Sequence, residues 1–530
     1  MSVQPKTIAR STMIIIILSL IGKLMGFGRE SLVAAVFGAN MEKDAFVAAQ
    51  SATSTVSQYI VMGISTVFIP GLQSVTNDRG ESGKLKYTSN IFFVVALLTL
   101  LIMGLGTLGA PFLAKLVGPK FDPATKALTV ELIRLAMPVI IFSALQGIFT
   151  GYLHFHNRFA AAASVSIWLN SVYLSYLVFF AKDFGIYGLT VASVLAVVVE
   201  FIVVYLASHH IGFRLKPYFS FSDPYTRQTL ILALPAIITV SVNNINTLVN
   251  RALASGLATG SMSRLDYANK LNVLIIGIFI TAITSVIFPP MAKAFDEGDY
   301  DRGKRIMNGS IRSVLLITIP SVVGLIILAQ PVVELAFMRG AFTQADADAT
   351  AVCLRFYTLS LIAISVTNVQ NRVFYSLEDT KTPFYIGMVN VACNVGLNLL
   401  LVSYMGINGL AFSVSVATTV VMLVSFYLIR KKIGNIGMTS YLKVFIKTGL
   451  AALFMGLVVY LVYFMGLEPL VFSQFDPGKT QTLARLLVFL LSIFIGVIVY
   501  GLALYGLGLK EAKDIKIYLE RKLRARFGTY

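Results

Sequence analysis

Apolar segments long enough to cross a lipid bilayer recur along the whole of this 530-residue chain. A transmembrane helix needs roughly 20 predominantly apolar residues, and about fourteen segments meet that requirement. They lie near residues 12–37, 45–70, 90–117, 128–153, 160–181, 186–207, 229–254, 264–291, 312–337, 347–375, 383–404, 407–429, 446–466 and 483–507. Because lipid cannot hydrogen-bond an exposed backbone, such segments must be helical. The sequence therefore predicts an all-α polytopic membrane protein with about fourteen transmembrane helices.

The composition agrees with this prediction and excludes an ordinary soluble domain. Only 13% of the residues are charged, whereas a soluble chain carries about a quarter, and the mean hydropathy is +0.80. Cys353 and Cys393 both lie in apolar runs and predict neither a disulfide framework nor a metal site. The basic start, residues 1–10, leads into an apolar run without a small-residue cleavage site, so we expect a retained first span.

The net charge of +18 raises the question of nucleic-acid binding, and the distribution of the charge argues against it. Most Lys and Arg residues lie in loops on one side of the predicted membrane. By the positive-inside rule that side is cytoplasmic, so both termini are expected there. Arg430–Lys432 is one dense basic group, and the tail 509–530 has the pattern of a basic amphipathic helix. Both groups predict contact with anionic lipids of the inner leaflet.

The chain contains an internal repeat. Arg29 and Asp44 are fifteen residues apart, and so are Arg251 and Asp266, which follow them at an offset of 222 residues. In each half the aspartate opens a small and apolar run that ends in proline. The repeat predicts two homologous bundles, made of spans 1–6 and spans 7–12.

The two bundles are expected to be pseudo-symmetric. A Gly-Ile-x-Gly-Leu motif also recurs, at residues 185–189 and 406–410. Because each bundle has an even number of spans, both have the same orientation, as in transporters that bind their substrate between parallel repeats. The predicted parts are an N-lobe at 1–227, a C-lobe at 228–445, two appended spans at 446–508 and the basic tail at 509–530.

No motif predicts an enzyme. The sequence has no Walker-type phosphate loop, no HExxH zinc motif and no GxSxG nucleophile elbow, the signatures of nucleotide hydrolysis, metalloproteases and α/β-hydrolases. We expect neither a cofactor nor a bound metal. Transport by such a chain would use an ion gradient, the membrane potential or the gradient of the substrate itself, with proton or monovalent-cation coupling left open.

Charged residues inside the first span are the strongest functional signal. Lys23, Arg29 and Glu30 fall within eight residues of an otherwise apolar segment, and charges at such depth normally face a polar cavity. The run at 28–46, GRESLVAAVFGANMEKDAF, resembles the MurJ (MviN) family of lipid II flippases, within the multidrug/oligosaccharidyl-lipid/polysaccharide exporter superfamily. The resemblance returns in three further places, residues 253–289, FMRGAF at 337–342 and RVFYSLEDTKTP at 372–383.

That resemblance implies a cavity between two lobes, in which cations bind the diphosphate of an undecaprenyl-linked glycan. The residues it implies for diphosphate binding are Lys23, Arg29 and Lys270, and Arg251 is a further candidate from the sequence itself. It implies acidic or gating roles for Glu30 and Asp44, and the internal repeat adds Asp266. Arginine suits the role because its planar fork binds a diphosphate bidentately. The structural alternatives are pairing of Arg29 with Glu30 or Asp44, and of Lys270 with Asp266 one helical turn earlier.

The sequence departs from the family pattern in four places. Lys23 stands where the usual residue is Arg, and Lys270 likewise replaces the eighth-span Arg. The second-span Arg is missing, and that stretch carries Ser51, Ser54, Ser57 and Gln58. Arg251 sits where many members carry Thr or Asp, so it would restore a cation to the cavity.

Other polar residues within the spans have weaker implications. Asn244, Asn390 and Asn394 are candidate ligands of a monovalent cation, with interhelical hydrogen bonding as the alternative. Glu200 lies in span 6, where we expect it to brace neighbouring helices.

The resemblance implies a flippase of the bacterial cytoplasmic membrane that moves lipid II to the outer leaflet by alternating access, for peptidoglycan biosynthesis. The polyprenyl tail would stay in lipid, in a groove beside spans 13 and 14, and the cell-wall synthesis machinery is a candidate partner. One alternative is a flippase for another lipid-linked oligosaccharide, such as an exopolysaccharide or teichoic-type precursor. A cation-coupled drug antiporter is less favoured, because spans 1, 7 and 8 carry an excess of cations.

Overall fold

The computed structural model describes residues 5–474 and 479–509, and the side chains of these residues except at 5–12, 234–244, 275–287, 472 and 479. Within those ranges the secondary structure is helical, and no strand occurs. The predicted all-α class is therefore confirmed. The helices are α1 (Pro5–Phe37), α2 (Met41–Leu108), α3 (Ala110–Val117), α4 (Pro123–Ala136), α5 (Val139–Phe155), α6 (Phe159–Phe179), α7 (Ala181–His210), α8 (Pro224–Ala254), α9 (Ser261–Asp296), α10 (Tyr300–Ile327), α11 (Ala329–Phe337), α12 (Gln344–Thr358), α13 (Ser360–Ser376), α14 (Lys381–Met405), α15 (Ile407–Ile433), α16 (Met438–Tyr460), the π-helix η1 (Leu461–Leu467), α17 (Glu468–Gln474) and α18 (Lys479–Gly506).

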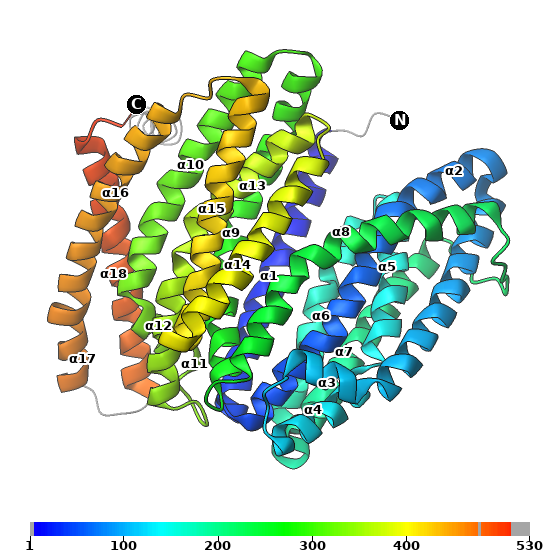
Figure 1. The fold of residues 1–530 in the computed structure, drawn as a ribbon, viewed down its shortest axis with the longest axis horizontal. Coiled ribbons are helices and arrows are strands. Elements are labelled where there is room, and N and C mark those ends of the chain that lie inside the picture. The colour runs from blue at the N-terminus through cyan, green and yellow to red at the C-terminus, as the bar shows by residue number, and fades with distance from the viewer. Residues whose placement is uncertain (1–4, 475–478, 510–530) are drawn as a thin grey trace, which may run out of the picture. The chain divides into compact units, whose positions relative to one another are not determined.

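The described part of the chain contains ten helical stretches that are long and apolar enough to cross a membrane. α2 covers the predicted second span and most of the third, and its two arms meet at Gly80 (Figure 1), whose φ of 65° and ψ of −162° are not helical. Glycine adopts such a conformation without a steric penalty. α1, α8 and α9 occupy the predicted first, seventh and eighth spans. The multi-pass architecture is confirmed, and about fourteen spans are compatible with it.

Side-chain caps explain where several helices begin. The side chain of Asn40 accepts a hydrogen bond from the Lys43 backbone N–H at the start of α2, and Asp223 accepts one from Thr226 at the start of α8. Such caps satisfy N–H groups that have no partner within the helix. Burial disfavours the ionised form of Asp223, but hydrogen bonds from Thr226 and Arg79 outweigh it and hold the pKa of that carboxyl below its usual value.

The chain divides into two compact units. The first unit is Met1–Asp266 with Phe337–Asp346, and the second is Tyr267–Ala336 with Ala347–Tyr530. The seventh span and the first residues of α9 therefore pack with the N-terminal half of the chain. The predicted tail helix falls almost entirely outside the described residues.

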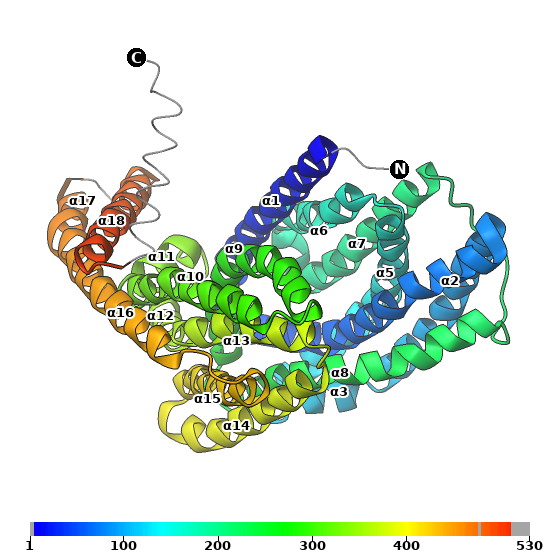
Figure 2. The ribbon, with the colours of Figure 1, turned by 90° about the horizontal axis from the view of Figure 1, so that it is seen from above.

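The first unit is centred on α2, α5 and α7, which pack against one another. Phe68, Phe149, Tyr152 and Phe213 are almost fully buried there. The ring centroids of Phe149 and Phe213 are 5.2 Å apart, in an edge-to-face arrangement. Figure 2 shows α5, α6 and α7 as neighbours in this unit. Aromatic packing of this kind holds together the helices that carry the polar site described below.

The second unit is built around α10, α13, α15 and α16. Its buried residues include Met307, Ile311, Val373 and Ile429, each fully enclosed. α16 packs against both α10 and α18 (Figure 1). The two appended helices thus belong to the packed body of this unit.

Candidate functional site

Arg29 lies near the end of α1 and is largely enclosed. Its guanidinium donates two hydrogen bonds to one carboxylate oxygen of Glu30, at 2.6 and 3.2 Å. It also lies over the ring of Tyr173 on α6, 4.8 Å from the ring centroid. The side chain of Arg29 is only 21% exposed, and a charge so enclosed needs a partner to offset the loss of hydration. The alternative prediction that Arg29 pairs with Glu30 is confirmed.

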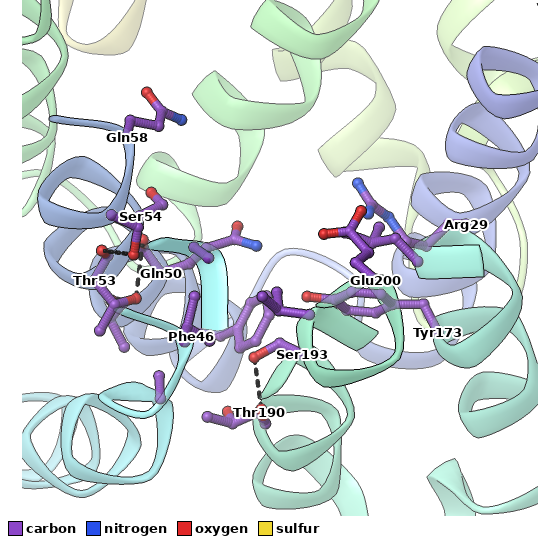
Figure 3. A pocket seen from close by; sticks show the side chains of 17 residues that line it. Arg29, Phe46, Gln50, Thr53, Ser54, Gln58, Tyr173, Thr190, Ser193 and Glu200 are labelled. Carbon is purple, nitrogen blue, oxygen red and sulfur yellow. Dashed lines mark hydrogen bonds between the residues drawn. The ribbon is translucent and has the colours of Figure 1, made fainter. Parts of the chain in front are cut away.

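A polar cavity of 240 Å³ opens beside Arg29, within the first unit. It is lined by Arg29, Phe46, Ala49, Gln50, Thr53, Ser54, Ser57, Gln58, Ala136, Val139, Ser143, Leu169, Tyr173, Thr190, Ser193, Val197 and Glu200 (Figure 3). These residues come from α1, α2, α4, α5, α6 and α7. Most of the polar groups among them are neutral hydroxyls and amides, so the cavity suits a polar ligand that Arg29 would attract.

The stretch of α2 that lacks the usual arginine forms one wall of this cavity. Gln50, Ser54 and Gln58 recur every four residues and line it together, as residues on one helical face do. Ser57 also lines the cavity, whereas Ser51 is buried and donates to the backbone oxygen of Val47 at 2.6 Å. The wall therefore offers hydrogen-bonding groups where a cation was expected from the family pattern.

Lys23 lies elsewhere on α1. It precedes Arg29 by six positions, and in an α-helix that offset turns the side chain by about 240°. Its side chain is exposed and is not among the residues that line the polar cavity. The predicted diphosphate-binding role of Lys23 stays a prediction.

Arg251, near the end of α8, lies 3.4 Å from the Asp266 carboxylate on α9. The corresponding pair of the first half, Arg29 and Asp44, is not joined in this way, because Arg29 binds Glu30 instead. The sequence repeat therefore does not extend to these ion pairs.

Asp44 binds the beginning of α9. Its carboxylate accepts hydrogen bonds from the backbone N–H groups of Gly260 and Ser263, at 2.7 and 2.8 Å, and from the Ser263 hydroxyl at 2.5 Å. An anion at this end of a helix satisfies unpaired N–H groups and interacts favourably with the helix dipole. Asp44 thus caps α9 from a different helix, a role compatible with the predicted gating.

The segment Phe337–Asp346 strengthens the same region of the first unit. Arg339 donates to the Ser31 hydroxyl at 2.8 Å, and the Ala341 N–H donates to the Ala35 oxygen at 2.8 Å. Arg264 forms an ion pair with Asp346 at 2.8 Å. These contacts join the end of α1 and the start of α9 to a segment far away in the sequence.

Three glycines allow this close approach, and we call them the glycine interlock: Gly38, Gly260 and Gly340. Each has a positive φ. A Cβ at any of them would lie 2.2–2.4 Å from a backbone oxygen, that of Ala341, Ala39 and Ala35 respectively. Larger residues would therefore be excluded both by conformation and by space. FMRGAF contains Gly340, so the motif has a packing role here.

Lys270 and the asparagines complete the predicted set. Lys270 lies on α9 in the second unit, with a half-buried side chain, and its predicted place beside Arg29 stays a prediction. Asn394 and Asn398 on α14 are buried and hydrogen-bonded to each other at 2.9 Å. Asn390 is half-buried, and the side chain of Asn244 lies outside the described residues. The predicted cation site is thus untested.

Two further residues belong to the polar cavity. The carboxyl group of Glu200 on α7 and the ring of Tyr173 on α6 both line it, and Figure 3 shows them beside Arg29. A glutamate within a predicted span is a recognisable signal, because membrane carboxyls usually have a function. Tyr173 had no such signal, since many tyrosines occur in these spans. Lys43 is 1% exposed and lies over the ring of Phe46, and the sequence carries no signal for this burial.

A second cavity, of 490 Å³, lies in the second unit between α10, α16 and α18. Its lining is almost entirely apolar and includes Pro320, Gly324, Met455, Phe489 and Val497. α16 and α18 carry the two appended spans predicted from the sequence. The cavity would accept a hydrocarbon chain, since it offers little hydrogen bonding to a polar ligand.

Comparison with known proteins gives a consistent result. Residues 33–505 match the family model described as lipid II flippase MurJ. The chain is 32% identical over 405 residues to a probable lipid II flippase MurJ of Rhizobium tropici, covering 74% of this chain and 76% of that protein. It is 26% identical over 428 residues to the corresponding protein of Vibrio cholerae, covering 78% and 81%.

Solved structures show the same fold. An inward closed conformation of lipid II flippase MurJ superimposes with a TM-score of 0.77 at 23% identity, covering 93% of this chain and 98% of that one. An inward-facing multidrug resistance MATE family transporter of the MOP superfamily gives a TM-score of 0.67 at 15% identity, with 81% and 99% covered.

Proposed function

Because this chain belongs to the MurJ family of lipid II flippases, we propose that it moves lipid II from the inner to the outer leaflet of the bacterial cytoplasmic membrane by alternating access. The observation that carries the mechanism is the enclosed guanidinium of Arg29 at the wall of a polar cavity. A diphosphate that leaves water needs a fixed cation to offset its loss of hydration, and arginine supplies one with two parallel donors.

Binding of the diphosphate requires Arg29 to exchange partners. Its guanidinium is held by Glu30 at 2.6 Å, so the charge is stabilised within the membrane-spanning helix. The diphosphate would then displace part of this pairing, and the hydroxyls and amides of α2 and α7 would bind the remaining oxygens. Lys23, Arg251 and Lys270 are further candidate ligands.

Alternating access also requires contacts that can break. With the N-terminus in the cytoplasm, the turn between α1 and α2 would lie on the outer side, together with Asp44 and the glycine interlock. Hydrogen bonds from Gly260 and Ser263 to Asp44 and the Arg264–Asp346 ion pair would hold that side shut. Release of the headgroup outward would break them.

The apolar cavity supports a place for the polyprenyl chain. Its lining from α10, α16 and α18 would shelter part of the hydrocarbon. The membrane potential is the proposed drive, because moving one charge through it is worth about 2.3 kcal/mol per 100 mV.

The test is complementation of a strain depleted of its lipid II flippase, together with headgroup exposure in proteoliposomes that contain lipid II and no nucleotide. Arg29→Ala should abolish complementation and headgroup exposure while the protein still accumulates. Arg29→Lys should retain part of the activity, because lysine keeps the positive charge but lacks the bidentate guanidinium. Arg158→Ala is the matched control, since Arg158 is exposed. Full activity of Arg29→Ala would remove the diphosphate role.

A further inference from the structure

Glu200 is a carboxyl group that the proposed mechanism does not use. It lies on α7, within a stretch long and apolar enough to span the membrane, and it lines the polar cavity with Arg29. Figure 3 shows the two side chains next to each other, with the amide of Gln50 pointing toward them from α2. A carboxyl at such a position is costly and usually functional.

Helix bracing does not account for Glu200. Within the described part of the chain its carboxyl group takes part in no hydrogen bond or ion pair. Glu30, by contrast, is bound directly to Arg29. The fold therefore has one carboxylate that stabilises Arg29 and a second that faces the same cavity without such a bond.

The surroundings of Glu200 contain few charged or titratable groups. α1 contributes Arg29 and the adjoining Glu30, and α6 contributes Tyr173. The residues that α2, α4, α5 and α7 itself add to the cavity are otherwise neutral. Loss of hydration disfavours any buried carboxylate, whereas a neighbouring cation favours it, and Figure 3 shows the Arg29 guanidinium beside Glu200. The protonation state therefore depends on what else is bound to Arg29.

We propose that Glu200 is a proton-binding site, and that it takes up one proton from water when the diphosphate of lipid II binds to Arg29. The inference rests on the proposed function, because it names the coupling of that same site. In this step the carboxylate oxygen forms an O–H bond while a hydronium ion or buffer acid in the aqueous phase gives up that proton, and no bond of lipid II changes.

The charges explain the coupling. With both carboxylates ionised, Arg29, Glu30 and Glu200 together carry one net negative charge, which repels a dianionic diphosphate. Protonation of Glu200 removes that excess. A diphosphate bound to Arg29 also neutralises the cation that favoured the carboxylate. Proton and diphosphate therefore strengthen each other's binding, and by thermodynamic linkage they do so by the same factor.

The cavity can supply the proton. Its volume of 240 Å³ leaves room for several water molecules, each of which needs polar partners to be held there. Gln50, Ser54 and Gln58 offer those partners along one face of α2. Water held along this wall would have access to Glu200, which lines the same cavity.

The experiment measures lipid II binding to the full chain in lipid nanodiscs. Calorimetry in buffers of different ionisation enthalpy counts the protons taken up, and lipid II suits the test because its diphosphate, esterified at both ends, keeps its charge near neutral pH. Wild type should take up protons, and its affinity should fall as pH rises, by at most about tenfold per pH unit for one proton. Glu200→Gln should lose both effects and bind at high pH at least as tightly as wild type does at low pH.

Two controls keep the result interpretable. Glu200→Asp should preserve proton uptake, and Asp183→Asn should behave as wild type, because Asp183 is an exposed carboxyl in the first turn of α7. Absence of proton uptake by wild type, or its full retention in Glu200→Gln, would overturn the inference. Should Glu200→Gln fail to accumulate, the wild-type proton count alone still decides. Unchanged lipid II affinity in Arg29→Ala would instead refute the diphosphate site, which is a separate readout.

Discussion

The cavity beside Arg29 and the cavity between α10, α16 and α18 are built from opposite kinds of side chain. The first is 240 Å³, carries an arginine and a glutamate, and is otherwise lined largely by hydroxyls and amides. The second is 490 Å³ and almost wholly apolar. Each lies within a different compact unit.

This difference matches the two parts of a lipid-linked glycan. A charged headgroup needs donors and a fixed cation, while a polyprenyl chain gains only from apolar contact. The comparison therefore predicts that changes in the first cavity alter headgroup binding, and that changes in the second alter dependence on the length of the hydrocarbon.

The largest effect is expected from charge reversal in the polar cavity. Arg29→Glu should weaken lipid II binding about 100-fold or more, because hydrogen bonds to charged groups contribute about 1.5–3 kcal/mol each and the new carboxylate adds repulsion. Binding to protein in nanodiscs is the measurement, with Arg158→Glu as the exposed control. Affinity within about threefold of wild type would mean that the two cavities do not divide the substrate in this way.

A smaller effect is expected from filling the apolar cavity. A Cβ at Gly324 would meet only the Met455 methyl, at 3.9 Å, so Gly324→Leu can enter the space without a backbone clash. Flipping of the undecaprenyl-linked substrate should fall about tenfold, since roughly 1.4 kcal/mol of apolar contact would be lost. A short-chain analogue should be affected little.

Gly449→Leu is the control for that substitution. Gly449 lies on α16 with no atom within 4 Å of its Cβ position, outside the residues that line the apolar cavity. Equal loss for long and short chains in Gly324→Leu would contradict the assignment of this cavity to the hydrocarbon.

A third substitution, Gly340→Ala, should loosen only the unit that contains the polar cavity. Gly340→Ala should destabilise the glycine interlock by about 1–3 kcal/mol, because the new Cβ meets the Ala35 oxygen at a positive φ. Hydrogen exchange of the Ala341 amide, which donates to Ala35, should become faster, while exchange in α16 and α18 stays unchanged.

Gly185→Ala is the control that separates the cost of a positive φ from the cost of a clash with a neighbouring backbone oxygen. Gly185 also has a positive φ, of 53°, but no atom lies within 4 Å of its Cβ position. It should therefore show the conformational cost without faster exchange at Ala341. Identical exchange in the two variants would show that the interlock is not a specific contact.

The smallest effect concerns Asp379, which lies before α14 and outside both cavities. Burial opposes its ionisation, but an ion pair with Lys432 and hydrogen bonds from Thr382 lower the pKa of Asp379 to about 2. A depressed pKa means that the stabilisation is present above the ordinary value of about 3.9 and is lost as pH falls toward 2.

Asp379→Asn should therefore flatten the loss of thermal stability in that acidic range. At neutral pH it should cost less than about 1 kcal/mol, because solvent screens an ion pair whose lysine is exposed. Lipid II binding should not change. A large effect of this substitution on binding would show that sites outside the two cavities control the substrate.

The sequence indicates the important residues more readily than their partners. Its pattern marks Arg29 as an intramembrane cation, and Arg29 lines a polar cavity. Its partner could be Glu30 or Asp44 on spacing alone, and the structure selects Glu30. Asp44 instead binds Gly260 and Ser263, more than two hundred residues away, which no local pattern indicates.

For Glu200, too, the sequence shows the residue but not its surroundings. The sequence shows a glutamate in an apolar span. A glutamate that braces neighbouring helices and one that lines a cavity would look the same in the sequence. The choice depends on which face of α7 meets α1 and α2. That rotation follows from the packing of several helices, and a change of one residue in register turns a side chain by about 100°.

The sequence by itself determined the class of protein, the order of its helices and its family. These follow from local properties, because apolar length and backbone satisfaction in lipid act segment by segment. Tertiary structure decided how the charges pair, that Phe337–Asp346 packs with the first unit, and that neutral residues of α2 share a cavity with Arg29 and Glu200. Such pairings depend on the rotation and close approach of helices remote in sequence, and for a buried charge the identity of the partner sets the energy.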